Sequence, residues 1–402
     1  MKFNARIAGL WVAGCAAIVL GAGCTSVSTE QVHPVGPVDE QVEIVLNAGI
    51  PFAVASDASQ SGAAAPETRA IVNAEHEALP ISILRLDATD DNTPTPSYPD
   101  YKTGTVLSAT LAAATSGSPT SAITFTTTQY YQANGCKTKL LGWHPQTDDS
   151  KVTFSSADGS VSFTIDGESD VMLSNEQEGS KTNGDRFGGN MVTPDETDPD
   201  TATDASKVLK FEHQLTQIKV SAYAFDAAAQ TAWGQLYSIT LKDQGGKTCK
   251  VTFPNTDGSN VTFSSSTPSS NLDLVKKNPA ENDAVIKGAD ATNEYDEDNG
   301  LTIPVGTDST NATPCGYAMF QPMNDSGDKL TLLVTTANVT DWPVDIALPT
   351  NTSGGNGFLK GTAYTIVLKF TAKDIHPSGQ ITDWVEHDWP SGEGQFNGEV
   401  EL

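Results

Sequence analysis

The residues of this chain that could do chemistry are few and stand far apart. None of its six histidines has a carboxylate or serine at the spacing of a catalytic triad, and none belongs to a metal-binding motif. The sequence has no GxSxG, HExxH, phosphate-binding loop or dinucleotide fingerprint. Glycoside hydrolysis needs only two carboxylates that the fold brings together, so it is the one catalytic alternative. We therefore predict that the chain is not an enzyme and uses no cofactor.

Three cysteines, Cys136, Cys249 and Cys315, stand singly, without a CxxC pair or a nearby pair of histidines. Structural zinc sites need clustered cysteine and histidine ligands, so we predict no metal. The acidic stretch 278–299 offers carboxylates to calcium, but it lacks EF-hand spacing, and a solvated loop is the simpler interpretation. At most one disulfide can form among three thiols. Buried or idle thiols are the simpler interpretation, and their redox state stays open.

The charge of the chain excludes one class of partner. Its 402 residues include 50 acids and 23 bases, for a formal net charge of -27, and the bases form no run. Nucleic-acid binding needs clustered positive charge, so we predict no such partner. Only 18% of the residues are charged, and Thr, Ser, Asn, Gly and Pro fill many of the polar positions. This composition favours strands and turns over helices.

Strand-like segments follow one another from Ile71 to the C-terminus, among them AITFTTTQYY, SVSFTIDG, LTLLVTT and AYTIVLKF. Each is bounded by turn-forming residues, at spacings that predict an all-β fold of antiparallel sandwiches. Glycine pairs such as Gly245-Gly246 stand between such segments and predict hairpin turns. Residues 226–236, and more weakly 110–117, suggest short helices. We expect a helix content below about 10%.

Two loop-like stretches divide the chain. Residues 175–206 are rich in acids, Gly and Pro and nearly free of large apolar side chains, which predicts a domain boundary. The second stretch is the acidic segment 278–299.

The N-terminus predicts an export signal over residues 1–23. Lys2 and Arg6 precede an apolar run, and GAGC at residues 21–24 is followed by polar residues. The run of about 15 residues is shorter than the roughly 20 that span a bilayer, so a transmembrane anchor is the weaker alternative. The GAGC segment resembles a bacterial lipobox, which implies a lipid on Cys24 and attachment to the outer membrane. VAGC, ending at Cys15, fits the motif more literally but would leave an apolar mature end.

Several segments together resemble the fimbrillin-like family, the subunits of type V pili. They are FEHQLTQIKVSAYA at 211–224, LLGWHP at 140–145, TIDGESDVMLS at 164–174 and GFLKGTAYTIVLKFTAKDIHPSGQITDW at 357–384. The resemblance implies two tandem transthyretin-like antiparallel β-sandwiches, over residues 70–203 and 204–402. Within the first segment, Phe211, Leu215, Ile218 and Val220 are expected to form one buried strand face, and His213 is expected to be a hydrogen-bonded structural side chain.

The resemblance also implies how such subunits assemble. The exported lipoprotein is cut after an arginine, an N-terminal strand leaves, and a strand from a neighbouring subunit fills the groove. PETRAI at residues 66–71 fits such a site, with cleavage between Arg69 and Ala70 and a leader over residues 24–69. QVEIVLNAGIPFAV at residues 41–54 is the strand expected to leave. An ordinary surface arginine is the alternative interpretation of Arg69.

The position within the pilus stays open at this point. The segment after Trp384 is short and acidic, which favours a tip or accessory subunit that accepts a strand without donating one, over a shaft subunit. The alternative function is a surface-anchored lipoprotein that binds glycan or protein ligands. In that case exposed tryptophans would serve as stacking platforms, and the candidates are Trp143, Trp233, Trp342 and Trp389.

Overall fold

The computed structural model describes most of the chain after residue 40. The described residues are 41–50, 76, 78–92, 94–114, 120–147, 149–182, 184–188, 207–255, 260–276, 300–323, 329–347, 350–351, 355–372 and 374–383. They form an all-β structure, as predicted. The predicted boundary between residues 203 and 204 stays a prediction, because residues 189–206 lie outside this set.

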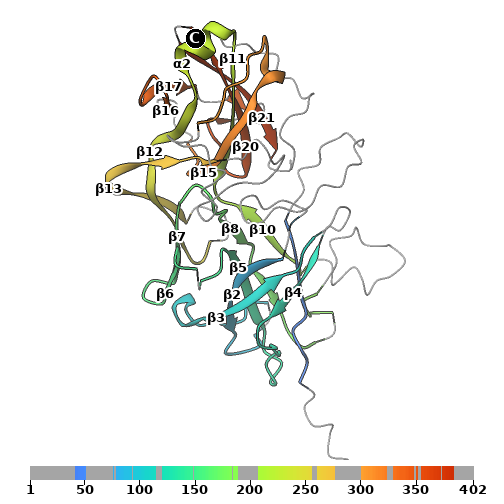
Figure 1. Ribbon diagram of the computed structural model, residues 1–402. Helices are drawn as coiled ribbons and strands as arrows, with labels where there is room; N and C mark the ends of the chain where they lie inside the picture. The colour runs from blue at the N-terminus through green and yellow to red at the C-terminus, as the bar shows by residue number, and fades with distance from the viewer. Residues whose placement is uncertain are drawn as a thin grey trace, which may run out of the picture. The chain divides into compact units, whose positions relative to one another are not determined.

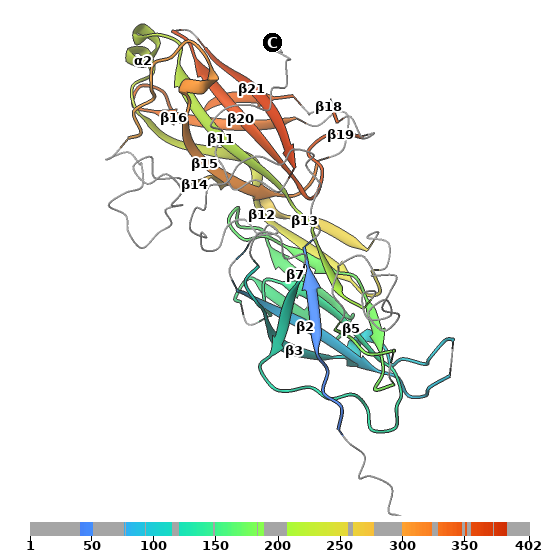
Figure 2. The same ribbon diagram turned by 90° about the vertical axis from the view of Figure 1, so that its right-hand side faces the viewer.

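The first group of strands forms one sheet that closes on itself. Hydrogen bonding joins the strands in the order β2, β3, β4, β1, β10, β8, β5, and β2 also pairs with β5, so seven strands form a ring, with β9 attached to β5. Figure 2 shows these strands around β2, β3 and β5, with β1 in blue. The strands are β1 (Leu46–Gly49), β2 (Leu79–Asp87), β3 (Thr105–Leu111), β4 (Ser121–Phe125), β5 (Thr138–His144), β8 (Met172–Ser174), β9 (Gln177–Gly179) and β10 (Leu209–His213).

This closure differs from the predicted antiparallel sandwich. β2 is antiparallel to β3 along one edge, where Ile83 lies opposite Leu107, and to β5 along the other, where Ile83 lies opposite Gly142. A strand that uses both edges within the ring leaves no open edge there. The two tandem transthyretin-like sandwiches are therefore not confirmed, and this part of the chain forms a closed sheet of seven strands.

The second group of strands forms two further sheets. One has the order β14 (Val275–Lys276), β15 (Thr313–Phe320), β11 (Thr216–Ala224), β20 (Thr362–Phe370) and β21 (Ile375–Asp383). The other has the order β17 (Trp342–Ile346), β16 (Leu330–Thr336), β12 (Leu236–Thr252), β7 (Ser160–Thr164) and β6 (Val152–Ser155), with β13 (Val261–Asp273) also on β12. Apolar side chains of β11 and β20 share one core with those of β12 and β16. A separate short pair joins β18 (Thr350–Asn351) to β19 (Gly355–Asn356).

Helix is scarce in the described residues. The α-helix α2 (Ala227–Trp233, Figure 1) lies where the sequence predicts it. Its N-cap Asp226 accepts a hydrogen bond from the Ala229 amide at 2.7 Å. Two 3-10 turns, η1 (Tyr101–Thr103) and η2 (Ser309–Asn311), complete the helical content described. The weaker helix expected at 110–117 is not formed at its start, because Thr110 and Leu111 belong to β3.

The segment 209–224 does not form one strand face. β10 ends at His213 and β11 begins at Thr216, and the two strands belong to different sheets. Phe211, Leu215 and Ile218 are all fully buried, but in three different hydrophobic cores. The alternating pattern predicts burial correctly and misses the change of sheet.

Strand β12 and its partner β13 connect the two groups of strands. Figure 1 shows the hairpin of β12 and β13. β12 pairs with β16 near its start and with β7 near its end, where Cys249 lies opposite Phe163. At its far end, the Phe253 ring stacks on Trp143 of β5, with ring centroids 5.9 Å apart. The predicted hairpin turn at Gly245-Gly246 is wrong, because both glycines lie inside β12, at an irregularity in its pairing with β13.

Candidate functional site: the leader strand

The predicted processing residues themselves, Cys24, Arg69 and Ala70, lie outside the described residues. The structure does describe residues 41–50 of the predicted leader, and these contain β1. β1 is thus both part of the predicted leader and a strand of the ring.

β1 is held along both of its edges. It is antiparallel to β4, with Leu46 opposite Ile123 and Ala48 opposite Ser121. It is parallel to β10, with Ala48 also opposite Leu209. β1 therefore closes a gap between β4 and β10, which do not pair with each other.

The residues just before β1 are paired as well. The Ile44 amide donates to the Gln129 carbonyl at 2.8 Å, and the Tyr131 amide donates to the Val42 carbonyl at 3.0 Å. Arg85 of β2 fixes this partner segment, because its guanidinium donates to Gln129 Oε1 at 3.1 Å. The leader thus adds backbone hydrogen bonds over most of residues 42–49.

Leader side chains alternate between the core and the surface. Ile44, Leu46, Ala48 and Ile50 are 3%, 0%, 0% and 5% exposed, whereas Val45 is 59% exposed. This period of two is the signal in the sequence that identifies the segment as a half-buried strand.

The four inward side chains belong to the main core of the closed sheet. They pack in one cluster with residues from β2, β3, β4, β5, β8 and β10, which include Ile81, Ile83, Leu111, Ile123, Leu140, Met172, Leu209 and Phe211. The leader strand is therefore part of the core and does not merely cover it.

A short segment at residues 187–188 contacts the leader from outside the ring. Asn47 Nδ2 donates to the Gly188 carbonyl at 2.9 Å. The Phe187 ring stacks on Tyr131 with centroids 5.8 Å apart, and the Phe187 amide donates to the Tyr131 hydroxyl at 2.6 Å. The bond from Asn47 therefore connects β1 to Gly188, which lies within the stretch 175–206 that predicts a domain boundary.

The interaction that this arrangement can support is strand pairing. A sheet that lacks β1 would expose the unpaired edges of β4 and β10 and a line of apolar pockets between them. Such a groove accepts any extended segment with apolar residues at alternate positions, because backbone hydrogen bonds supply affinity and the pockets supply specificity.

The other residues that the sequence singles out have structural surroundings. His213 Nδ1 lies 2.7 Å from Asp170 Oδ2, which agrees with a hydrogen-bonded structural side chain. Cys136, Cys249 and Cys315 are buried thiols outside any disulfide. Burial raises the pKa of Cys249 to about 12 and also raises that of Cys315.

Two of the four tryptophans considered as ligand platforms are core residues. Trp143 and Trp233 are 0% and 4% exposed. Trp342 is partly buried and makes an edge-to-face contact with Trp233, with centroids 5.4 Å apart. Trp389 lies outside the described residues. Neither Trp143 nor Trp233 can therefore stack on a ligand at the surface.

Across the described ranges, no three His, Cys, Asp or Glu side chains gather as a metal site would require. The longest helix there is the seven-residue α2, and none of those helices could cross a membrane.

Comparisons with known proteins give a family. A family model described as fimbrillin-like matches residues 68–384. A putative cell adhesion protein from Bacteroides uniformis is 12% identical, with 87% of this chain and 100% of that chain covered and a TM-score of 0.47. A fimbrial protein from Bacteroides vulgatus is 15% identical, with 76% and 93% covered and a TM-score of 0.39.

A third solved structure is the tip fimbrial protein Mfa3 from Porphyromonas gingivalis with a C-terminal truncation. It is 13% identical, with 86% of this chain and 100% of that chain covered and a TM-score of 0.35. No curated protein matches the chain. Because the identities and TM-scores are this low, the family assignment rests on the match to the family model alone.

Proposed function

Because the chain belongs to the fimbrillin-like family, we propose that it is a subunit of a cell-surface fimbrium in which β1 holds the place of a strand from another subunit. The single observation that carries the proposal is the position of β1. It comes from the predicted leader, and it lies between β4 and β10 with its apolar side chains in the core.

The extent of the family match supports the same division of the chain. The match begins at residue 68, whereas β1 ends at Gly49. The ring strand that lies outside the matched region is thus the one that the proposal removes. In this proposal Cys24 carries the lipid that holds the precursor at the outer membrane, and cleavage between Arg69 and Ala70 releases the leader.

Strand replacement has a physical driving force. Loss of β1 leaves backbone groups of β4 and β10 unpaired and exposes apolar surface in the main core. A donor strand from a neighbouring subunit satisfies both needs at once, so that subunit association completes a fold. The connection from β1 to residue 69 has about 20 residues, so cleavage there cuts no strand of the ring.

For the position in the fimbrium we propose a tip or accessory subunit. The proposal rests on the sequence after Trp384, which is short and acidic and has only FNGEVEL at its end as a weak alternating segment. Deletion of residues 390–402 should leave fimbrial length unchanged for a tip subunit. Truncated polymers would instead identify a shaft subunit that donates this segment.

Limited digestion of the purified full chain with an arginine-specific protease tests the processing step. We expect a new N-terminus at Ala70, and the gain of oligomerisation or of binding to a donor-strand peptide. Arg69→Gln should abolish both, whereas Lys250→Gln, a control on β12 where Lys250 pairs with Asp158, should leave the cleavage unchanged. A chain that resists cleavage at Arg69 and stays lipid-anchored would overturn the proposal and favour an anchored ligand-binding lipoprotein.

A further inference from the structure

A short segment that follows β9, residues 185–188, lies against the outer face of the leader strand. Asn47 Nδ2 donates to the Gly188 carbonyl at 2.9 Å. Gly188 is so close to the leader that a Cβ on it would lie 3.2 Å from the Val45 carbonyl oxygen, and its φ of 115° also favours glycine. The leader therefore meets the groove through an outward polar contact as well as through its buried side chains.

This segment is held by parts of the chain that stay when the leader is removed. Phe187 is buried in the core of the closed sheet, and its amide donates to the Tyr131 hydroxyl at 2.6 Å. The Asp185 carbonyl accepts a hydrogen bond from Lys207 Nζ at 2.9 Å, just before β10. We therefore expect the Gly188 carbonyl to be in place before another strand enters the groove.

An acceptor held in this way discriminates between incoming strands. The bond between Asn47 and Gly188 is partly buried. A strand without a donor at this position leaves the carbonyl without that bond, at a cost of about tenfold in affinity. A carboxylate there is unfavourable as well, because it places a second acceptor and a negative charge against the carbonyl oxygen.

The apolar alternation of the leader does not by itself fix the register of an incoming strand. A shift by one residue turns the apolar side chains outward, whereas a shift by two residues returns them to the core. A donor required beside Gly188 removes this ambiguity, because one register alone places it there. The next position adds a limit on size, since Ala48 is fully buried in the core and a large side chain would have to displace its neighbours.

We propose that the Gly188 carbonyl and the small site at Ala48 select the strand that enters the groove. This inference rests on the proposed function and adds a sequence rule for the partner. Three consecutive residues of the incoming strand are a large apolar residue, an asparagine and a small residue, as Leu46, Asn47 and Ala48 are in the leader. The position of Val45 has no such requirement, because that side chain points outward and is largely exposed.

Competition between peptides tests this rule. The purified full chain is cleaved with the arginine-specific protease and mixed with equal amounts of isotope-labelled peptides of residues 41–50. Mass spectrometry of the isolated complex then gives the ratio of the bound peptides. We expect the unaltered peptide to be bound about tenfold more than peptides with Asn47→Asp or Asn47→Leu, and about tenfold more than one with Ala48→Leu.

The peptides include a matched control. Val45→Asp makes a change of charge like that of Asn47→Asp, but at an exposed position of the same strand, and it should lower the bound share at most about threefold. Asn47→Leu separates selection by Gly188 from general apolar affinity, because hydrophobicity alone would make this peptide bind more tightly than the unaltered one.

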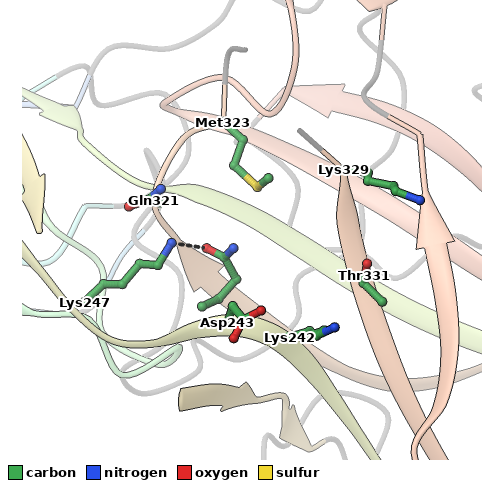
Figure 3. A pocket seen from close by; sticks show the side chains of 8 residues that line it. Lys242, Asp243, Lys247, Gln321, Met323, Lys329 and Thr331 are labelled. Carbon is green, nitrogen blue, oxygen red and sulfur yellow. Dashed lines mark hydrogen bonds between the residues drawn. The ribbon is translucent and has the colours of Figure 1, made fainter. Parts of the chain in front are cut away.

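A pair of hydroxyl deletions in the chain assigns the selection to the segment 185–188. Tyr131→Phe removes the hydroxyl that accepts from the Phe187 amide, so the preference for asparagine over aspartate should fall to about threefold. Thr331→Val is the matched control, at a hydroxyl that donates to Asp345 Oδ1 at 2.7 Å. Thr331 lines a polar cavity beside β12, whose lining includes no residue of the leader or the closed sheet (Figure 3). This variant should leave the preference unchanged.

The possible results separate this rule from the proposed function. Binding of the unaltered and Asn47→Asp peptides in equal amounts would leave strand replacement in place and overturn selection by Gly188. An unchanged preference in Tyr131→Phe, shown by thermal unfolding to be folded, would place the selection elsewhere. Uptake of none of the peptides by the cleaved chain would overturn strand replacement, and the rule with it.

Discussion

Leu46 of the leader strand lies directly opposite Ile123 of β4, and both side chains are buried in the core of the closed sheet. The first belongs to a segment that we propose to be removed, and the second to the body that stays. In the proposed processing, removal of β1 therefore takes away part of a folded core, and the groove that it leaves would bind a replacement strand.

Leu46→Ala tests the energetic role of the leader. The Leu46 side chain is fully buried, so its truncation should lower the free energy of unfolding by about 2–5 kcal/mol, measured by urea denaturation of the full chain. Val45→Ala is the matched control, because Val45 is 59% exposed in the same strand. It should change stability by less than about 0.5 kcal/mol. Equal effects of the two variants would contradict the register of β1.

Phe253→Ala tests the contact at the far end of the β12–β13 hairpin. The Phe253 ring stacks on both Trp143 and Tyr101, with centroids 5.9 and 6.0 Å away. Because Phe253 is only partly buried, we expect a loss of about 2 kcal/mol, seen as a lower urea midpoint. Phe225→Ala, at a ring that is 45% exposed, should have a much smaller effect. A Phe253→Ala midpoint equal to that of the unaltered chain would contradict the packing.

His144 should make stability depend on pH. Burial lowers the pKa of the His144 imidazole, against a hydrogen bond between Nδ1 and the Pro80 carbonyl at 2.8 Å. The folded chain then binds fewer protons than the unfolded chain, so stability from this group is full above the unfolded pKa of about 6.5 and is lost as the pH falls through it. The slope is at most about 1.4 kcal/mol per pH unit.

Urea denaturation between about pH 7.5 and 5.5 measures this slope. In His144→Gln the dependence should become flatter, whereas in His376→Gln, at an exposed residue of β21, it should stay as in the unaltered chain. An unchanged slope in His144→Gln would show that the imidazole is not the group responsible.

The buried thiols should be chemically inert in the folded chain. Burial raises the pKa of Cys249 to about 12 and raises that of Cys315, so very little thiolate is present at neutral pH. Iodoacetamide should leave both residues unmodified in the native protein and alkylate them after denaturation, as peptide mass mapping reports. Rapid alkylation of native Cys249 would contradict its burial.

Local patterns in the sequence predicted the local features well. The strand expected within residues 41–54 and the short helix expected within residues 226–236 are present as β1 and α2. Both signals depend on residues close together in the chain, where side-chain direction follows directly from backbone geometry.

Pairings between distant segments could not be read in this way. The ring closes because β2 pairs with β5, and a strand pattern does not say which partners its two edges take. Gly245-Gly246 predicts a turn, but both glycines lie within β12, which pairs with β13 both before and after them.

A covalent lock on the leader tests the central proposal most directly. Asn47 lies opposite Ala122 across β1 and β4, so Asn47→Cys with Ala122→Cys should form a disulfide that keeps β1 in place after cleavage. Thr153→Cys with Ser162→Cys, between β6 and β7, is the control. In fimbriated cells of the native host, we expect the locked subunit to be cleaved but absent from fimbriae, and to enter them after reduction. Incorporation of the oxidised, locked subunit at the level of the control would contradict strand replacement.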